Sequence, residues 1–287
     1  MAATPANGAS PSRRDTDVRA PFASVALLGA FAGLLVSACS EPAAQGYRAQ
    51  RTSAGTPDLS GIWQSNNTAN WDLEAHVARQ GPVFALGAAF SVPPGLGVVE
   101  NGEIPYLPAA LEKRKTNGSN WMKLDPEVKC YMPGIPRATY MSYPFQIVQS
   151  TDTILMTYEF ASASRVIRMN SKETSPAPAW MGWSIGRWDG ESLVIDVTDH
   201  MEDTWFDRAG NYHSDALKVT ERYTALDANT LQYEATIEDP KIFSRPWKIT
   251  MPLYRRREPN MQLMEYKCVE FAEELMYGHL RKKPGTP

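Results

Sequence analysis

The sequence predicts a mainly β protein, an antiparallel up-and-down barrel or half-barrel with a few short helices. Three observations lead to this fold class. Short runs of strand-favouring residues follow one another from Phe145 onward, turn residues separate the runs, and an amphipathic segment with a cationic end follows the last run. Antiparallel strands that pair with their sequence neighbours form a meander, and a long meander curls until its edges meet.

The expected elements follow in chain order. Asp58–Trp63 predicts a short first strand, and Leu107–Gly118 predicts one helix that ends at a glycine. Prolines make Cys130–Pro144 a rigid extended connection. The later strands are expected at Phe145–Gln149, Ile154–Phe160, Arg165–Met169, Gly182–Trp188, Ser192–Val197, Leu217–Ala225, Thr230–Ile237, Trp247–Tyr254 and Gln262–Tyr266. Asp189-Gly190 is a strong hairpin turn, and Val269–Lys283 predicts a C-terminal helix.

The first residues of the chain predict export. Three arginines precede an uncharged apolar run, Phe22–Ala38, that is too short and wrongly flanked for a membrane-spanning helix. Small residues then precede Cys39, a pattern typical of bacterial lipoproteins that are cleaved before the cysteine and acylated on its thiol. An ordinary signal peptide that leaves a free soluble protein is the alternative. Ser40 after the cysteine favours anchoring in the outer membrane, on the periplasmic side.

The domain organisation follows from this interpretation. Residues 1–38 are expected to be a lipoprotein signal peptide, and residues 39–56 lack apolar periodicity and predict a flexible tether. Residues 57–287 are expected to form a single β-rich domain. With Cys39 lipidated, Cys130 and Cys268 remain as an even pair in an oxidising compartment, which predicts a disulfide. The alternative is two buried thiols that never meet.

Composition and motifs argue against several classes of function. The net charge of -3 provides no basic field for nucleic acid, and the membrane is expected to be a partner only through the lipid on Cys39. No phosphate-cradling glycine loop occurs, and no zinc-ligand spacing of histidines or cysteines occurs, so we expect no cofactor and no metal. Calcium bound by the acidic residues of Asp199–Asp203 is the less favoured alternative.

Gly182-Trp183-Ser184-Ile185-Gly186 matches the pattern that presents the serine nucleophile of many esterases. That arrangement requires a strand, a sharp turn at the serine and a helix immediately afterwards. Here Ser184 is followed by a tight Asp-Gly turn and a second strand. We therefore expect Ser184 to lie inside one arm of a hairpin and not to be a nucleophile.

The densest group of chemically useful residues lies between Asp199 and Tyr223. Asp207 and His213 are six residues apart across an expected turn, so the carboxylate could orient the imidazole as a general base. Glu221 would share the face of His213 if one strand ran unbroken, and Tyr223 could supply a donor. The alternative is a turn that satisfies its own backbone beside a structural ion-pair network.

Aromatic side chains indicate the class of ligand. Such rings line pockets for apolar or aromatic small molecules and stack against them. The candidate ligand-binding residues are Trp183, Trp205, Trp180 and Tyr140, with Arg137 as an anchor for a ligand carboxylate. The alternative is that most of these rings pack in the core and that the arginine caps a loop.

Several motifs together resemble a large family of mostly uncharacterised exported bacterial proteins. They are PDLSGIW, DPEVKCYMPGIPR, YPFQIVQ, WMGWSIGRWDGESLVIDV, TWFDRAGNYHSDALKVTERY, IEDPKIFSRPWKITMPLYRR and KCVEFAEELMYGHLRK. The resemblance implies a shared fold and export, and it carries no established reaction. The glycine two residues before Trp63 and the up-and-down strands are also similar to lipocalin-like (calycin) barrels, which would place a ligand in the barrel mouth or interior.

Three hypotheses about function follow. The first is an envelope-anchored barrel that binds a hydrophobic or aromatic small molecule and catalyses a cofactor-free acid–base reaction on it, an isomerisation, elimination or hydrolysis. His213 would be the base, Asp207 its orienting carboxylate, and Glu221 or Tyr223 the acid or oxyanion donor. The second is a periplasmic binding lipoprotein without catalysis, and the third is a structural envelope lipoprotein.

Overall fold

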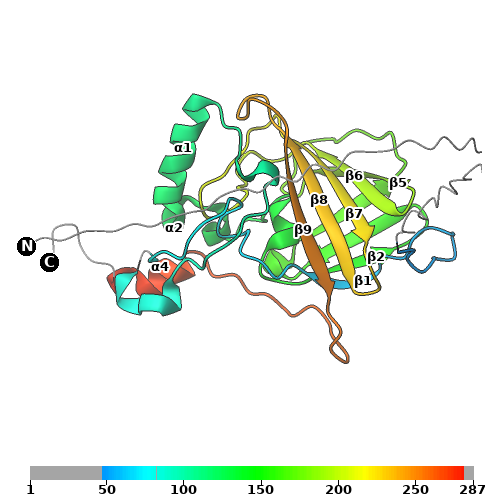
Figure 1. Ribbon diagram of the computed structural model, residues 1–287, viewed down its shortest axis with the longest axis horizontal. Coiled ribbons are helices and arrows are strands. Elements are labelled where there is room, and N and C mark those ends of the chain that lie inside the picture. Colours follow the sequence, from blue (N-terminus) through cyan, green and yellow to red (C-terminus); the bar gives the residue numbers. More distant parts are fainter. Residues whose placement is uncertain (1–46, 82, 281–287) are drawn as a thin grey trace, which may run out of the picture. The chain divides into compact units, whose positions relative to one another are not determined.

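The computed structural model describes residues 47–81 and 83–280, and these residues form a closed β-barrel (Figure 1). The strands of the described residues follow one another around the barrel in chain order, and the last pairs with the first. They are β1 (Gly61–Gln64), β2 (Phe145–Gln149), β3 (Thr153–Tyr158), β4 (Ser164–Met169), β5 (Trp183–Asp189), β6 (Ser192–Thr198), β7 (Lys218–Ala225), β8 (Thr230–Glu238) and β9 (Trp247–Arg255). The predicted fold class is confirmed.

Side-chain alternation along the strands defines the barrel interior. In β8, Leu231, Tyr233, Ala235 and Ile237 are buried, and the residues between them are partly exposed. The same period of two runs along β7 and most of β9. Successive side chains of a strand point to opposite faces, so the alternate apolar residues of the strands together fill the barrel.

One pair of neighbouring strands departs from the expected antiparallel meander. β4 and β5 are parallel, with Ile167 opposite Ser184 and Met169 opposite Gly186. Parallel neighbours require a connection that carries the chain back to the same end of the barrel, and residues 170–182 make this crossing. The other neighbouring pairs are antiparallel, and the Asp189-Gly190 turn joins β5 to β6 as expected.

The expected strand at Gln262–Tyr266 is wrong. These residues form no ladder with any described strand. The barrel closes through β1 and β9, so no free strand edge remains for another strand to pair with. The segment is held by other contacts, because the Met264 N–H donates to Glu159 Oε2 at 2.8 Å and the Tyr266 ring packs against Tyr143.

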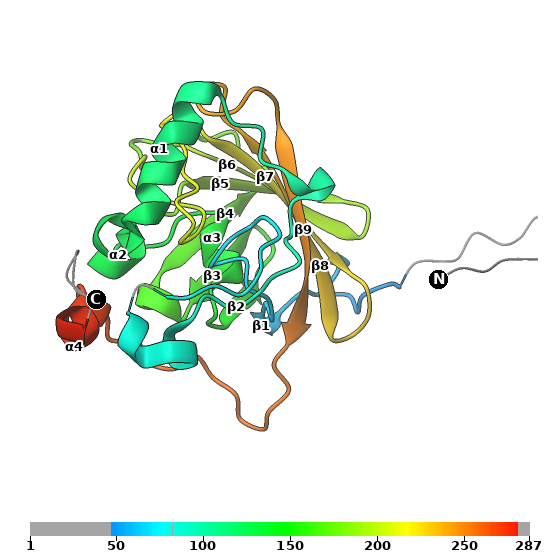
Figure 2. The ribbon, with the colours of Figure 1, turned by 60° about the vertical axis from the view of Figure 1, so that its left-hand side comes forward.

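Short helices lie at one end of the barrel, with α3 at the centre of its opening (Figure 2). They are α1 (Pro108–Ser119), α2 (Trp121–Leu124), α3 (Arg137–Tyr140) and α4 (Ala272–Tyr277), with 3-10 turns at Phe84–Phe90, Glu100–Gly102, Pro126–Lys129, Phe160–Ser162 and Gly278–Leu280. The helix expected at Leu107–Gly118 is α1. Cys130–Pro144 is not extended throughout, because it contains the buried turn of α3.

The C-terminal segment is fastened to the middle of the chain. Cys130 and Cys268 form the predicted disulfide across a separation of 138 residues. Beyond it, the Phe271 N–H donates to the Val128 carbonyl at 2.7 Å, and Glu273 lies 3.4 Å from Arg208. The expected C-terminal helix is present as α4, and these contacts hold it against the loop that precedes α3.

The predicted signal peptide, Cys39 and the first part of the tether lie outside the described residues. Tyr47–Thr56, expected to belong to the tether, lies against the barrel: Ala49 is buried, Asp58 N–H donates to the Gln50 carbonyl at 2.7 Å, and Arg51 pairs with Glu191. No helix in the described part of the chain combines the length and the apolar content that a membrane span requires.

Candidate functional site

A charged pair lies inside the barrel. Arg165 of β4 and Glu221 of β7 are each less than 5% exposed, and two guanidinium nitrogens approach the two carboxylate oxygens at 2.5 and 3.2 Å. Tyr223 and Tyr233 donate their hydroxyls to Glu221 Oε1 at 3.0 and 2.8 Å. Removing two charges from water is costly, and this set of bonds offsets the cost by satisfying both groups.

The two phenols of this interior cluster keep their protons. Burial, and after it the negative charge of Glu221, raises the pKa of Tyr223 and of Tyr233 well above the ordinary value, so both phenols stay protonated and keep donating. Glu221 and Tyr223 were expected near His213, as acid or oxyanion donor. They are hydrogen-bonded to each other, and neither is hydrogen-bonded to His213. The strand that was to connect them is interrupted, because β7 begins only at Lys218.

Ser184 belongs to the same interior. It lies in β5, is 1% exposed, and its hydroxyl accepts from Arg165 at 3.4 Å. A strand, and no helix, follows the turn after it. The local structure is therefore the hairpin arm that the sequence predicts.

Asp207 and His213 do not form the expected hydrogen-bonded pair. Asp207 accepts from the Leu73 N–H at 2.9 Å, the Asn211 N–H at 3.1 Å and the Asn211 side-chain amide at 2.6 Å. The carboxylate thus accepts hydrogen bonds from the backbone of its own turn and of Leu73. This is the alternative interpretation of the sequence, a turn that satisfies its own backbone. His213 lies beyond the turn, where the Trp205–Tyr212 bridge places it beside Thr204.

Burial gives Asp207 an unusual protonation equilibrium. Desolvation, followed by the charge of nearby Asp72, raises its pKa from 3.8 to about 7, although its three hydrogen bonds oppose the shift. A carboxyl with such a pKa is poised between its two forms near neutral pH. It is fully buried, and its three hydrogen bonds hold the turn around it.

His213 is fixed in one tautomer. Its Nδ1 lies 2.9 Å from the Ser214 carbonyl oxygen, which only accepts, so Nδ1 carries the proton. Its Nε2 lies 2.6 Å from the Thr204 hydroxyl and accepts from it. Burial lowers the pKa of His213, which keeps the ring neutral near pH 7 with its lone pair directed at Thr204.

His213 also forms part of the wall of a cleft of about 300 Å³ at the helix-covered end of the barrel. Aromatic, cationic and anionic side chains share the lining: Tyr131, Trp205, Tyr212, Lys113, Lys129, Glu202 and Asp203. The Lys113 ammonium lies 4.4 Å from the centre of the Tyr212 ring. We call this space the His213 cleft. Its volume is at the lower end of the range for small-molecule sites, and polar groups make up most of its exposed lining.

His200 lies behind His213, with ring centroids 5.8 Å apart. The ring is 2% exposed, and neither nitrogen has a hydrogen-bond partner of normal geometry within the described residues. Burial, followed by the neighbouring His213, lowers its pKa to about 3, against a weaker opposing effect of the Val197 backbone. Sequence reasoning left the role of this residue open. Asp199, which lies between β6 and His200, has a positive φ, and nothing in the sequence pattern indicates a change of chain direction there.

The candidate ligand-binding aromatics separate into two groups. Trp205 lines the His213 cleft, and Trp180 packs against cleft residue Tyr131 with ring centroids 4.7 Å apart. Trp183 does not line the cleft, and the Arg168 guanidinium carbon lies 3.8 Å from the centre of its ring. Tyr140 is fully buried and donates to the Phe206 carbonyl at 2.9 Å, so it packs in the core as the alternative interpretation holds.

Arg137 does not serve as an anchor for a ligand carboxylate. It is 1% exposed, and its guanidinium donates to Asp125 at 2.7 and 2.9 Å and to Glu127 at 2.7 Å. Two carboxylates already hold this cation, so no donor faces a cleft. It joins α3 to the loop before it.

Neither a metal-binding group within the described residues nor a match to a known protein indicates the function. The described residues contain no group of three or more His, Cys, Asp or Glu side chains arranged to hold a metal ion. No protein-family model and no curated protein sequence matches the chain.

Proposed function

We propose that this protein binds a small apolar or aromatic molecule in the His213 cleft, and that His213 is the acid–base group of a cofactor-free reaction on it. The observation that carries the proposal is the neutral imidazole of fixed tautomer in the wall of an aromatic cleft. Neither a charged histidine nor one with both nitrogens committed to carbonyls could accept a proton there.

The lining of the cleft indicates which molecules fit. Tyr131 is 40% exposed and provides a ring surface, to which Trp205 and Tyr212 add little because they are 9% and 4% exposed. A cleft of about 300 Å³ has room for one or two fused rings with short substituents. Cations and carboxylates stand together in the wall, so their charges offset each other and the cleft favours no strongly charged ligand. A neutral aromatic molecule with one polar group fits best.

His213 would act on an acidic C–H or O–H of such a ligand. A proton passes to Nε2, either directly or by way of the Thr204 hydroxyl, which gives its own proton to Nε2 as it takes one from the ligand. Return of the proton to another atom of the ligand completes an isomerisation. The Ser214 carbonyl holds the Nδ1 proton and stabilises the imidazolium formed in between.

Proton exchange tests this function without knowledge of the substrate. We expect the protein to speed deuterium uptake next to the carbonyl of 2-tetralone in heavy water, followed by proton NMR. His213→Gln should remove the acceleration, and His279→Gln, which changes a histidine outside the cleft, should keep it. Equal exchange by protein and buffer would reject the acid–base step.

Non-catalytic binding is the second candidate, and one observation favours it. Within the described residues no carboxylate hydrogen-bonds to His213, so the imidazole lacks the orienting partner that a strong base usually has. Quenching of tryptophan fluorescence by 2-tetralone without deuterium uptake would support a carrier. Absence of both would leave a structural envelope protein.

We also propose the location that the N-terminal sequence predicts, a lipid-anchored protein on the periplasmic side of the outer membrane. The cysteine at position 39, the apolar run before it and the resemblance to exported bacterial proteins support it. Cells that express the full chain should incorporate labelled palmitate into it, and Cys39→Ser should abolish this labelling. Labelling that persists in the variant would contradict the proposal.

A further inference from the structure

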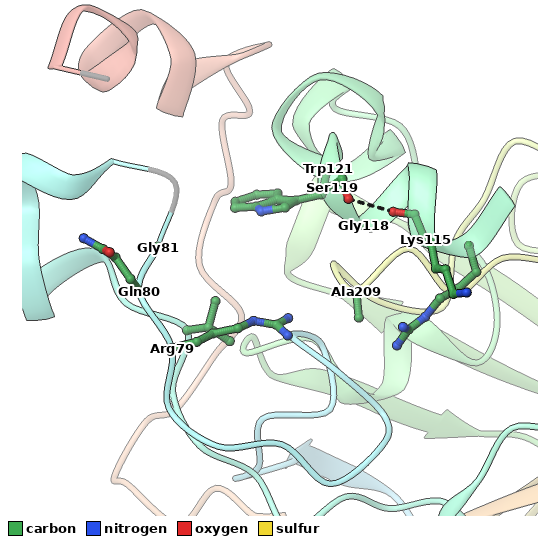
Figure 3. A pocket seen from close by; sticks show the side chains of 10 residues that line it. Arg79, Gln80, Gly81, Lys115, Gly118, Ser119, Trp121 and Ala209 are labelled. Atoms are coloured by element: carbon green, nitrogen blue, oxygen red, sulfur yellow. Dashed lines mark hydrogen bonds between the residues drawn. The ribbon is translucent and has the colours of Figure 1, made fainter. Parts of the chain in front are cut away.

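A second cleft, of about 430 Å³, lies between α1, the start of α2 and the segment that carries Arg79 (Figure 3). It shares no lining residue with the His213 cleft. Arg79, Arg114 and Lys115 line it, together with the indole of Trp121, and no carboxylate belongs to the lining. The wall therefore presents cations and a small part of one large ring, because Trp121 is 8% exposed.

The three cations differ in how far the protein already satisfies them. Arg114 donates to Asn211 at 3.2 Å and to Glu74 at 3.4 Å, and Lys115 lies 2.7 Å from Glu112. The Arg79 side chain makes no hydrogen bond within the described residues. Its only ionic contact there is with Asp72, at the long distance of 4.0 Å.

The backbone at Arg79 is held in place, while its guanidinium donors have no hydrogen-bond partner within the described residues. Its side chain is 52% exposed, and Figure 3 shows it reaching into the space that Trp121 borders from the other side. Backbone bonds in both directions between Arg79 and Val92 fix the segment that carries it. A guanidinium presents planar paired N–H donors, the geometry that a carboxylate accepts.

We propose that this cleft binds a small aromatic carboxylate, with the carboxylate on Arg79 and the ring beside Trp121. A planar acid matches both features, because its anionic group pairs with the fork of the guanidinium while its ring meets the indole. Asp72 lies behind Arg79 with its side chain 7% exposed, and its charge makes a single negative charge on the ligand a better fit than two. The site is independent of the proposed function.

Titration calorimetry on the full chain tests the site, with benzoate as probe and benzamide as its neutral counterpart of the same shape. We expect benzoate to bind at least about tenfold more tightly than benzamide, since hydrogen bonds to a charged group are the stronger kind. Arg79→Gln should remove this preference. Arg245→Gln, which changes an exposed arginine in another cleft, should retain it.

Three results would overturn the proposal. They are equal binding of benzoate and benzamide, absence of benzoate binding to the unaltered protein, and benzoate binding that Arg79→Gln leaves unchanged. Lys129→Gln identifies the competing location, since Lys129 lines the His213 cleft. Loss of binding in that variant alone would assign the anion to the His213 cleft. Thermal melts of each variant separate lost binding from lost folding.

Discussion

At the scale of single residues, the hydrogen bond between Thr204 and His213 decides the chemistry of the His213 cleft. The hydroxyl donates to Nε2 at 2.6 Å, and both residues are at most 2% exposed, so the bond lies in the inner wall of the cleft and not in open solvent. A buried acceptor that loses its partner costs about 1–3 kcal/mol. The tautomer of the ring and the stability of the fold are therefore linked at this pair.

Thr204→Val should reveal that link. The substitution keeps the shape of the side chain and removes its hydroxyl, so we expect the free energy of unfolding to fall by about 1–3 kcal/mol in urea denaturation. Thr204→Ser retains the donor and is the matched control. A valine variant as stable as the serine variant would show that the bond at Nε2 contributes nothing.

His200 should make the protein acid-sensitive. Its folded pKa of about 3 lies below the ordinary 6.5, so between these values the unfolded chain binds the proton more readily. Stability from this residue is thus present above pH 6.5 and declines as the pH falls toward 3. At 1.36 kcal/mol per pKa unit, the loss approaches about 3 kcal/mol at pH 4.

His200→Leu isolates this effect from the carboxyl groups that also titrate there. Within the described residues neither ring nitrogen has a hydrogen-bond partner of normal geometry, so the substitution removes no such bond. We expect urea denaturation at several pH values to give a shallower loss of stability below pH 6.5 for the variant. Parallel curves for the two proteins would exclude His200 as the source.

At the scale of elements, the interior pair joins strands on different parts of the barrel. Arg165 of β4 and Glu221 of β7 each depend on the other, because either one alone would be a buried charge without its partner. Arg165→Met should therefore destabilise the barrel by about 3–5 kcal/mol. Arg165→Met combined with Glu221→Gln should recover much of that loss. Additive losses in urea denaturation would indicate that the pair is not coupled.

The elements are also where sequence reasoning worked best. The bounds of β2 and of β4 to β9 were predicted to within one residue at each end. Strand-favouring residues between turn signals mark these strands, and in most of them alternation with a period of two does so as well. Gln262–Tyr266 has the same local pattern and forms no strand. Whether a strand edge is free depends on barrel closure, which is a property of the whole fold.

The candidate site was predicted less well, for reasons that are also physical. The Asp207 turn could be read two ways, and the competition between capping the backbone and orienting His213 was decided by the nearby Leu73 N–H. The partner of Glu221 lies 56 residues away in β4. Arg165 stands at an inward position of an alternating strand, and that signal could have identified it as a buried cation in need of an acid.

At the scale of the whole molecule, the disulfide limits how far the chain can separate. It closes a loop of 138 residues, which in the chain-entropy model stabilises the fold by up to about 5 kcal/mol. For a domain of this size each kcal/mol moves the melting temperature by about 2–4 °C. Cys130→Ser with Cys268→Ser should therefore lower it by up to roughly 10–20 °C, and reduction of the native chain should do the same.

The segment after β9 should respond first to that loss, because the other contacts that hold it lie outside the strand ladder. It contributes no strand to the barrel, and α4 buries none of its side chains. Limited proteolysis under reducing conditions should therefore cut between Met261 and Phe271 while the barrel remains intact. Figure 1 shows this segment running along the outside of the barrel, so its release leaves the strand ladder complete. Simultaneous loss of barrel and segment would mean instead that the disulfide is part of the cooperative core.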